Sequence, residues 1–201
     1  MERKIPIRLL TTIAIGIGAT GDPAAAHAPF AGIGSFYGGL IHPFLALPEL
    51  LLLLSVSLLL GRAGNRVAGS GFLILIAAIV AGMMLPLVFP SCSAPTVATL
   101  GLALACAATL SLDVRSPAWI LSGTSGASGI FVGVGVTPDE GPFSAMMLAG
   151  VGSALGAAFV SLILAGVTLT WHRGWKVVLI RLLGAWVSAI GIMTVALHLR
   201  R

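Results

Sequence analysis

Charged side chains are scarce in this sequence. Of its 201 residues, 8% are charged and 58% are hydrophobic. A soluble domain has about a quarter of its residues charged, so this chain cannot cover a water-facing surface in the ordinary way. It is also too hydrophobic for a disordered chain, which needs low hydrophobicity and high charge. The composition therefore predicts an integral membrane protein of several helices.

Cysteines and catalytic motifs are equally sparse. The two cysteines, Cys92 and Cys106, do not form a disulfide framework. On one helix, their 14-residue separation would be about 20 Å of rise, too far for a bond. We find no nucleophile–base pair, no Gly-x-Ser-x-Gly motif and no phosphate-binding loop, so no enzyme is predicted. At about 20 residues per span, the chain has room for six or seven helices but not for an ATPase domain.

The first 28 residues have the pattern of a secretory signal peptide. A positively charged start precedes an apolar stretch over Leu9–Gly18 and a small-residue cleavage site at residues 24–28. We expect cleavage after Ala26 or after Ala28; an uncleaved segment would form a seventh helix. Cleavage after Ala26 would make His27 the N-terminus, whose amine and imidazole could bind one metal ion. The alternative is that His27 is only spacer.

Six apolar segments follow and predict one transmembrane domain over residues 29–201. Each is near or above the length needed to cross a bilayer. Backbone groups in lipid must be satisfied locally, so the segments are expected to be helices. The predicted fold class is an all-α, polytopic membrane helix bundle. The segments are Phe36–Leu60, Gly71–Phe89, Thr96–Leu112, Pro117–Val136, Phe143–Leu169 and Val177–Leu199.

The loops between these segments alternate in charge. The first, third and fifth loops carry Arg or Lys, the second is uncharged, and the fourth carries only Asp139 and Glu140. By the positive-inside rule, the odd loops face the cytoplasm and both mature termini face the periplasm of a bacterial inner membrane. The terminal Arg200–Arg201 pair is the one exception. The net charge of +5 is thus explained by cytoplasmic loops rather than by a nucleic-acid partner.

Glu49 is the most informative residue, because it lies about midway along the first predicted span. A charged group there is expensive and indicates a functional site. His42 precedes it by seven residues, about two helical turns, which predicts one shared face and about 10 Å of rise between them. Pro43 and Pro48 predict a kinked or opened helix whose freed carbonyls could join His42 and Glu49 in binding a cation. The alternative is that Glu49 makes a structural hydrogen bond and His42 caps a helix end.

The fourth and fifth predicted spans are rich in small residues. The fourth contains Ser122–Gly129 and the fifth contains Gly152 and Gly156 four residues apart. Such residues let helices approach closely, so we expect both spans to pack tightly. A second interpretation is that hydroxyls, Ser125 and Ser128 above all, line a pathway.

The first span resembles the opening of the HupE/UreJ proteins. Ala26-His27-Ala28 is followed by Phe36–Leu51, with the sequence FYGGLIHPFLALPELL. In that family the first span reads like G-F-x-H-P-x-x-G-x-D-H-L-L. His42-Pro43 matches its His-Pro, Leu50-Leu51 matches its Leu-Leu, and Pro48-Glu49 stands in place of Asp-His. The resemblance implies a small membrane protein with a signal peptide and about six spans, associated with hydrogenase or urease and regarded as a nickel or cobalt permease or accessory protein.

The fourth span departs from the family pattern. A His-Gly-x-Ala-His-Gly type motif is usual there, whereas this sequence has Thr124–Gly129, which keeps Ala127 and Gly129 but has no histidine. Despite this departure, the resemblance implies handling of nickel, cobalt or another divalent metal. The candidate ligands are His42, Glu49 and His27. The alternatives are an accessory subunit of a larger membrane complex with a degenerate metal site, or a copper-handling protein using His27 with methionine and cysteine sulfur. Besides lipid and metal, the expected partners are other membrane proteins or further copies of this chain.

Overall fold

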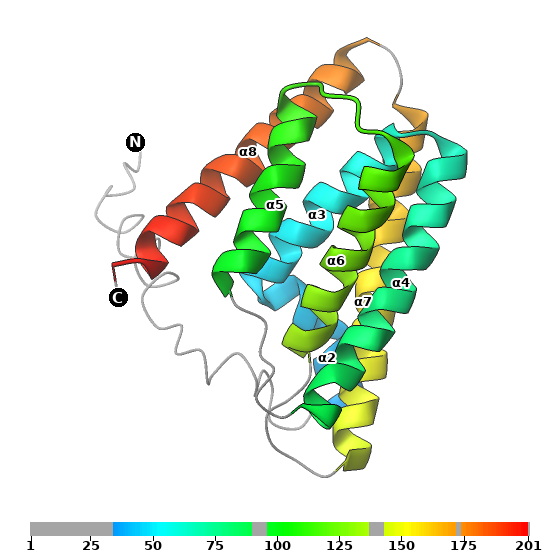
Figure 1. Cartoon of the computed structure of the whole chain (residues 1–201), viewed down its shortest axis with the longest axis vertical. Helices are drawn as coiled ribbons and strands as arrows, with labels where there is room; N and C mark the ends of the chain where they lie inside the picture. Colours follow the sequence, from blue (N-terminus) through cyan, green and yellow to red (C-terminus); the bar gives the residue numbers. More distant parts are fainter. Residues whose placement is uncertain (1–33, 90–95, 137–142, 172–173, 201) are drawn as a thin grey trace, which may run out of the picture.

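The computed structural model describes residues 34–89, 96–136, 143–171 and 174–200, and all their regular secondary structure is helical. The helices form a bundle in which most axes run along its long dimension (Figure 1). Their bounds are α2 (Ser35–Leu45), α3 (Leu47–Arg62), α4 (Asn65–Val88), α5 (Thr96–Ser111), α6 (Ala118–Val136), α7 (Phe143–Thr170) and α8 (Trp175–His198).

Four of these helices, α4, α6, α7 and α8, are long and apolar enough to cross a membrane. Helices α2 and α3 together make a fifth candidate span, bent by 71°. The expected kink in the first span is thus confirmed. Helix α5 has 16 residues, about 24 Å of rise against about 30 Å of hydrocarbon. The count of six spans therefore stays a prediction, as does the signal peptide, which lies outside the described residues.

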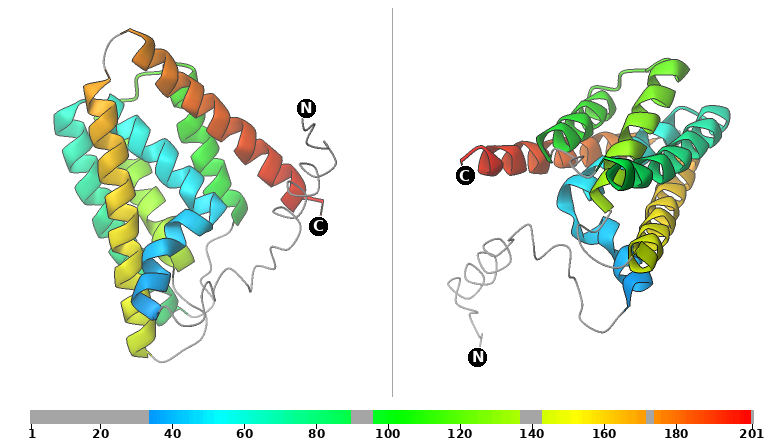
Figure 2. Two further views of the ribbon diagram at one scale, coloured as in Figure 1. Left: turned by 180° about the vertical axis from the view of Figure 1, so that it is seen from behind. Right: turned by 60° about the horizontal axis from the view of Figure 1, so that its bottom comes forward.

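Helix α3 occupies the centre of the bundle and contacts each of the other described helices (Figures 1 and 2). From Leu51 to Gly61 every residue except Leu54 is buried. A helix that is apolar on all sides belongs inside a protein or a membrane, and its Leu-rich sequence explains the central position. This helix places Glu49 near one end of the bundle core and Arg62 at the other.

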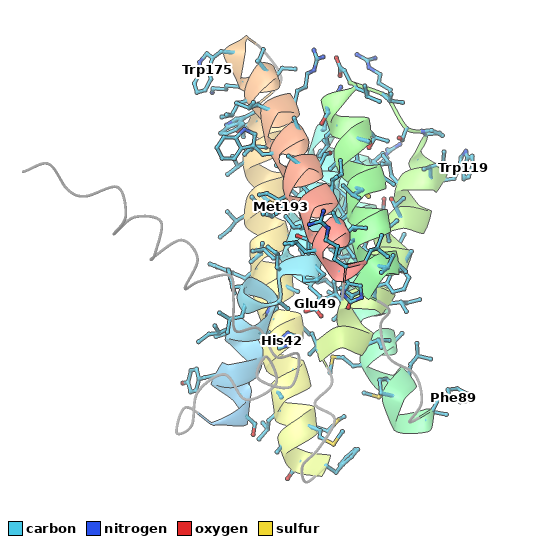
Figure 3. All side chains as sticks on the ribbon, turned by 90° about the vertical axis from the view of Figure 1, so that its left-hand side faces the viewer. His42, Glu49, Phe89, Trp119, Trp175 and Met193 are labelled. Carbon is cyan, nitrogen blue, oxygen red and sulfur yellow. The ribbon has the colours of Figure 1, made fainter. Side chains whose placement is uncertain are left out.

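The outer surface of the bundle is apolar. Large hydrophobic side chains are exposed on α4, α7 and α8, including Leu73, Phe159 and Trp186. Figure 3 labels other exposed ones, Phe89, Trp119, Trp175 and Met193. In water such a surface would drive aggregation, whereas lipid solvates it. The exposure pattern supports a multi-pass membrane protein.

Glycines bring two helix pairs into close contact. In the α4–α6 pair, a Cβ on Gly129 would overlap the carbonyl oxygen of Leu75. In the α2–α7 pair, a Cβ on Gly152 would overlap that of Phe36. Only a residue without a side chain permits such backbone approach. The prediction that the two small-residue spans pack tightly is confirmed.

The three basic loops meet at one end of the bundle. Arg62, Arg115 and Trp171, from the first, third and fifth loops or the helix ends beside them, line one common cavity. This geometry agrees with the alternation expected from loop charge. Which end faces the cytoplasm remains a prediction of the positive-inside rule.

Candidate metal-binding site

The site begins with the first proline of the broken span. Pro43 has no backbone N–H, so it cannot bond to the carbonyl oxygen of Gly39, four residues earlier. The hydroxyl of Ser153 on α7 donates to that oxygen at 2.5 Å. Ser153 therefore satisfies one acceptor position of this freed carbonyl, and its service to a cation stays a prediction.

The break itself lies at Ala46. This residue has an extended backbone (φ −79°, ψ 96°) and forms both the C-cap of α2 and the N-cap of α3. Pro48 follows in the first turn of α3, where its missing N–H is harmless and its fixed φ favours a helix start. Because Pro48 cannot donate to Phe44, the α2 hydrogen-bond ladder cannot continue into α3. The chain therefore ends one helix and starts the next at an angle of 71°.

This bend brings His42 and Glu49 together. Their Nδ1 and Oε2 atoms are 3.3 Å apart, and the two side chains are 9% and 12% exposed. Figure 3 shows them near one another, where α2 meets α3. The predicted separation of about 10 Å is wrong, because it assumed a straight helix. The two side chains are thus closer than the sequence suggested. That they bind a cation stays a prediction.

Helix α6 closes the site on the side of Glu49. A Cβ on Gly135 would overlap Oε1 of Glu49, so the carboxylate lies directly against the backbone of α6. Glu49 also lies in the first turn of α3, where the helix dipole stabilises negative charge. The lack of a side chain at Gly135 and the start of α3 together fix where the carboxylate can lie.

The pair offers one imidazole nitrogen and one carboxylate oxygen. Both are ligand types that divalent transition metals accept. Two ligand atoms bound to one ion at about 2.1 Å lie about 3.0–3.4 Å apart, and the observed 3.3 Å fits this range. Among the described residues, no group of three or more His, Cys, Asp and Glu side chains could hold a metal ion. Water or backbone oxygens would have to complete the coordination.

Ser125 and Ser128 are buried on α6 but lie away from the pair. Ser125 donates to Leu121 within its own helix at 2.7 Å, and its hydroxyl lies beside Gly71 near the basic end of the bundle. Ser128 is seven residues before Gly135, about 10 Å along α6. The structure thus brings neither serine to His42 and Glu49. Their role as pathway lining remains a prediction.

The structure shows two further buried serines that the sequence alone did not indicate. Ser57 on α3 and Ser161 on α7 each bury a hydroxyl that, like that of Ser128, has no hydrogen-bond partner among the described residues. Gly61 of α3 packs on Ala165 of α7, and Ser57 and Ser161 lie one turn before these contacts. Ser57 is about 12 Å along α3 from Glu49, a depth similar to that of Ser128. The sequence signal was the polar interruption of the leucine run that begins α3.

Of the remaining candidate residues, His198 and Met83 lie in the part of the chain that the structure describes. His27, Asp139, Glu140, His172 and Cys92 lie outside the described residues. His198 is exposed in the last turn of α8. Met83 is buried, and its side chain occupies the space beside Gly150 that a Cβ would need. This is a packing role, and no described contact favours the copper hypothesis.

These features define a multi-pass helical membrane protein with a buried His–Glu pair at a break in one span. The family model described as HupE / UreJ protein matches residues 15–194, so the chain belongs to the HupE/UreJ family. This family suggests a nickel or cobalt accessory or permease-type membrane protein and is not known as an enzyme family. No curated protein and no solved structure matches the chain.

Proposed function

We propose that this protein moves a divalent metal ion of the nickel or cobalt type across the membrane without an ATPase of its own. The observation that carries the proposal is the 3.3 Å distance between His42 Nδ1 and Glu49 Oε2 inside a broken span. Membership of the HupE/UreJ family supports the choice of cargo. The metal is the transported substrate, not a resident cofactor.

The two residues have different roles in this proposal. His42, at the end of α2, receives the ion through an imidazole nitrogen. Glu49 supplies a negative charge where the low dielectric makes an unpaired cation expensive. A site with only two strong protein ligands binds weakly enough to release its ion, which transport requires.

Beyond the pair, buried hydroxyls offer the next oxygen ligands. Ser128 on α6 and Ser57 on α3 lie at similar depth. Ser57 and Ser161 each lie one turn before the contact of Gly61 on α3 with Ala165 on α7. We propose that these hydroxyls and Ser125 line the inward path. Inward movement requires that α2 face the periplasm, as the loop charges predict.

An accessory role is the second candidate function. The fourth span has no histidine, and the described residues contain no larger metal cluster. In this reading the His42–Glu49 contact only joins α2 to α3, and the small-residue helices pack against a larger membrane complex. Detergent extraction would then recover the chain with stoichiometric partners. A single-component, monodisperse particle would count against this reading.

The deciding experiment is metal binding and uptake by the purified, reconstituted protein. We expect nickel or cobalt to bind, and Glu49→Gln and His42→Ala each to weaken binding about tenfold or more, as loss of a charged ligand does. The matched control is His198→Ala, which removes an exposed histidine from α8 and should leave binding unchanged. Unchanged metal uptake in the His42→Ala, Glu49→Gln double variant would overturn the proposal.

A further inference from the structure

A cavity of about 440 Å³ opens at the basic end of the bundle, away from the His42–Glu49 pair. The ends of α3 and α7, the α5–α6 connection and the first turns of α8 form its walls. Its polar lining includes Arg62, Asp113 and Arg115, and its apolar lining includes Trp171, Val177 and Ile180.

Positive charge exceeds negative charge around this cavity. Arg115 and Arg181 both lie close enough to Arg62 to repel it. The acidic residue in the lining is Asp113, which forms an ion pair with Arg62. Among the described residues that line or flank the cavity, three arginines (Arg62, Arg115 and Arg181) against one aspartate leave an excess of two positive charges. In a bilayer interface such an excess attracts anions.

Two of the three arginines are held by the end of α5. Arg62 Nη1 donates to the carbonyl oxygen of Leu110 at 3.4 Å, and Arg181 Nε donates to that of Ser111 at 3.1 Å. Carbonyls at a helix C-terminus carry partial negative charge and attract cations. Asp113 adopts a left-handed backbone (φ 60°), which is uncommon for a residue other than glycine and places its carboxylate on Arg62.

Arg115 differs from the other two. It lines the cavity and is exposed, and within the described part of the chain it has no hydrogen bond or ion pair. Its guanidinium therefore keeps all five N–H donors for a ligand. A planar guanidinium suits a phosphate group, which it can bind through two parallel hydrogen bonds.

We propose that this cavity binds the phosphate of an anionic lipid headgroup, with Arg115 as the main donor and Arg62 as the supporting charge. Trp171 and the aliphatic side chains give the acyl chains an apolar contact, and Trp is enriched at the level of headgroups. The inference does not depend on the proposed metal transport.

Lipid retention by the purified full-length protein tests this inference. The protein is reconstituted with phosphatidylglycerol or with phosphatidylcholine, and bound lipid is counted by native mass spectrometry. We expect retention of phosphatidylglycerol but not of phosphatidylcholine, and about a tenfold loss in Arg115→Ala. Arg115→Lys should keep part of the binding, because lysine retains the positive charge but cannot donate two parallel hydrogen bonds from a planar group.

Arg66→Ala is the matched control, because Arg66 is an exposed arginine of the same basic end that does not line the cavity. Equal loss of lipid in Arg66→Ala and Arg115→Ala, or no loss in Arg115→Ala, would overturn the proposal.

Competition with inorganic phosphate is a further experiment. If phosphate displaces phosphatidylglycerol and binds lipid-free protein with the same dependence on Arg115, the phosphate site stands and its source is the aqueous phase. If it does neither, the site belongs to the lipid.

Discussion

His42 Nδ1 lies 3.3 Å from Glu49 Oε2 although two helical turns of sequence separate the residues. In a straight helix, seven residues would span about 10 Å of rise. The 71° bend between α2 and α3 removes this distance. The break therefore creates the site, and the residues that stabilise the break are as testable as the pair itself.

The first prediction concerns Ser153, whose hydroxyl bonds to the Gly39 carbonyl left free by Pro43. Ser153→Ala leaves that buried oxygen without its partner, at a cost of about 1–3 kcal/mol. We expect a lower unfolding temperature in detergent and weaker metal binding, because α2 loses an anchor to α7. Thermal unfolding and metal titration of the purified variant measure both effects.

Ser188→Ala is the control for Ser153. Ser188 donates to Gly184 within its own helix, so its removal breaks no contact between helices. Equal unfolding temperatures for the two variants would show that the Ser153 bond does not hold the broken span.

The second prediction concerns Gly135, the residue of α6 against which the Glu49 carboxylate lies. Gly135→Ala adds a methyl group in the place of Oε1 and forces the carboxylate away from its position. We expect metal affinity to fall about tenfold or more, because a displaced carboxylate cannot share one ion with His42. Equilibrium binding of nickel and cobalt checks this.

Gly123→Ala on the same helix is its control, because a Cβ there has nothing within 4 Å. Both changes replace glycine by alanine within α6, so their intrinsic effect on helix propensity is comparable. Equal metal binding in the two variants would mean that Glu49 does not need its place beside Gly135.

The sequence predicted the membrane class, most helix positions and the break in the first span, because each depends on local composition. Hydropathy places helices, and Pro43 and Pro48 remove specific backbone donors. The distance between His42 and Glu49 could not follow from the sequence, because it depends on the direction of the bend. That direction depends on contacts far along the chain, such as Ser153 with Gly39.

The buried serines show the same limit. The sequence points to Ser125 and Ser128 because they lie in a polar run where the family has histidines. Ser57 and Ser161 lie in apolar stretches more than 100 residues apart, and only the packing of α3 on α7 relates them. A single sequence does not show how α3 and α7 align along each other.

The third prediction concerns orientation. If the basic loops are cytoplasmic, a cysteine introduced at exposed Arg66 should resist a membrane-impermeant maleimide in intact spheroplasts and react after permeabilisation. A cysteine at exposed Ser35, at the start of α2, should react in the same intact spheroplasts. Both are made in a background with Cys92 and Cys106 replaced by serine. The reverse labelling pattern would invert the topology and, with it, the proposed direction of transport.

The fourth prediction tests whether the buried serines of α3 and α7 line the metal path or only pack the helices together. Ser55 and Ser57 are both fully buried on α3, but Ser55 donates to Leu51 and Leu52 of its own helix, whereas the Ser57 hydroxyl has no partner among the described residues. If Ser57 lines the path, Ser57→Ala should slow metal uptake several-fold and leave equilibrium binding at His42 and Glu49 unchanged. Ser161→Ala on the facing helix should do the same, and the double variant should be no worse than additive.

Ser55→Ala removes a hydroxyl of equal burial and should affect uptake little. If Ser57→Ala and Ser55→Ala give the same initial rate in proteoliposomes, the ion does not pass these hydroxyls, and the small residues between α3 and α7 serve helix packing alone.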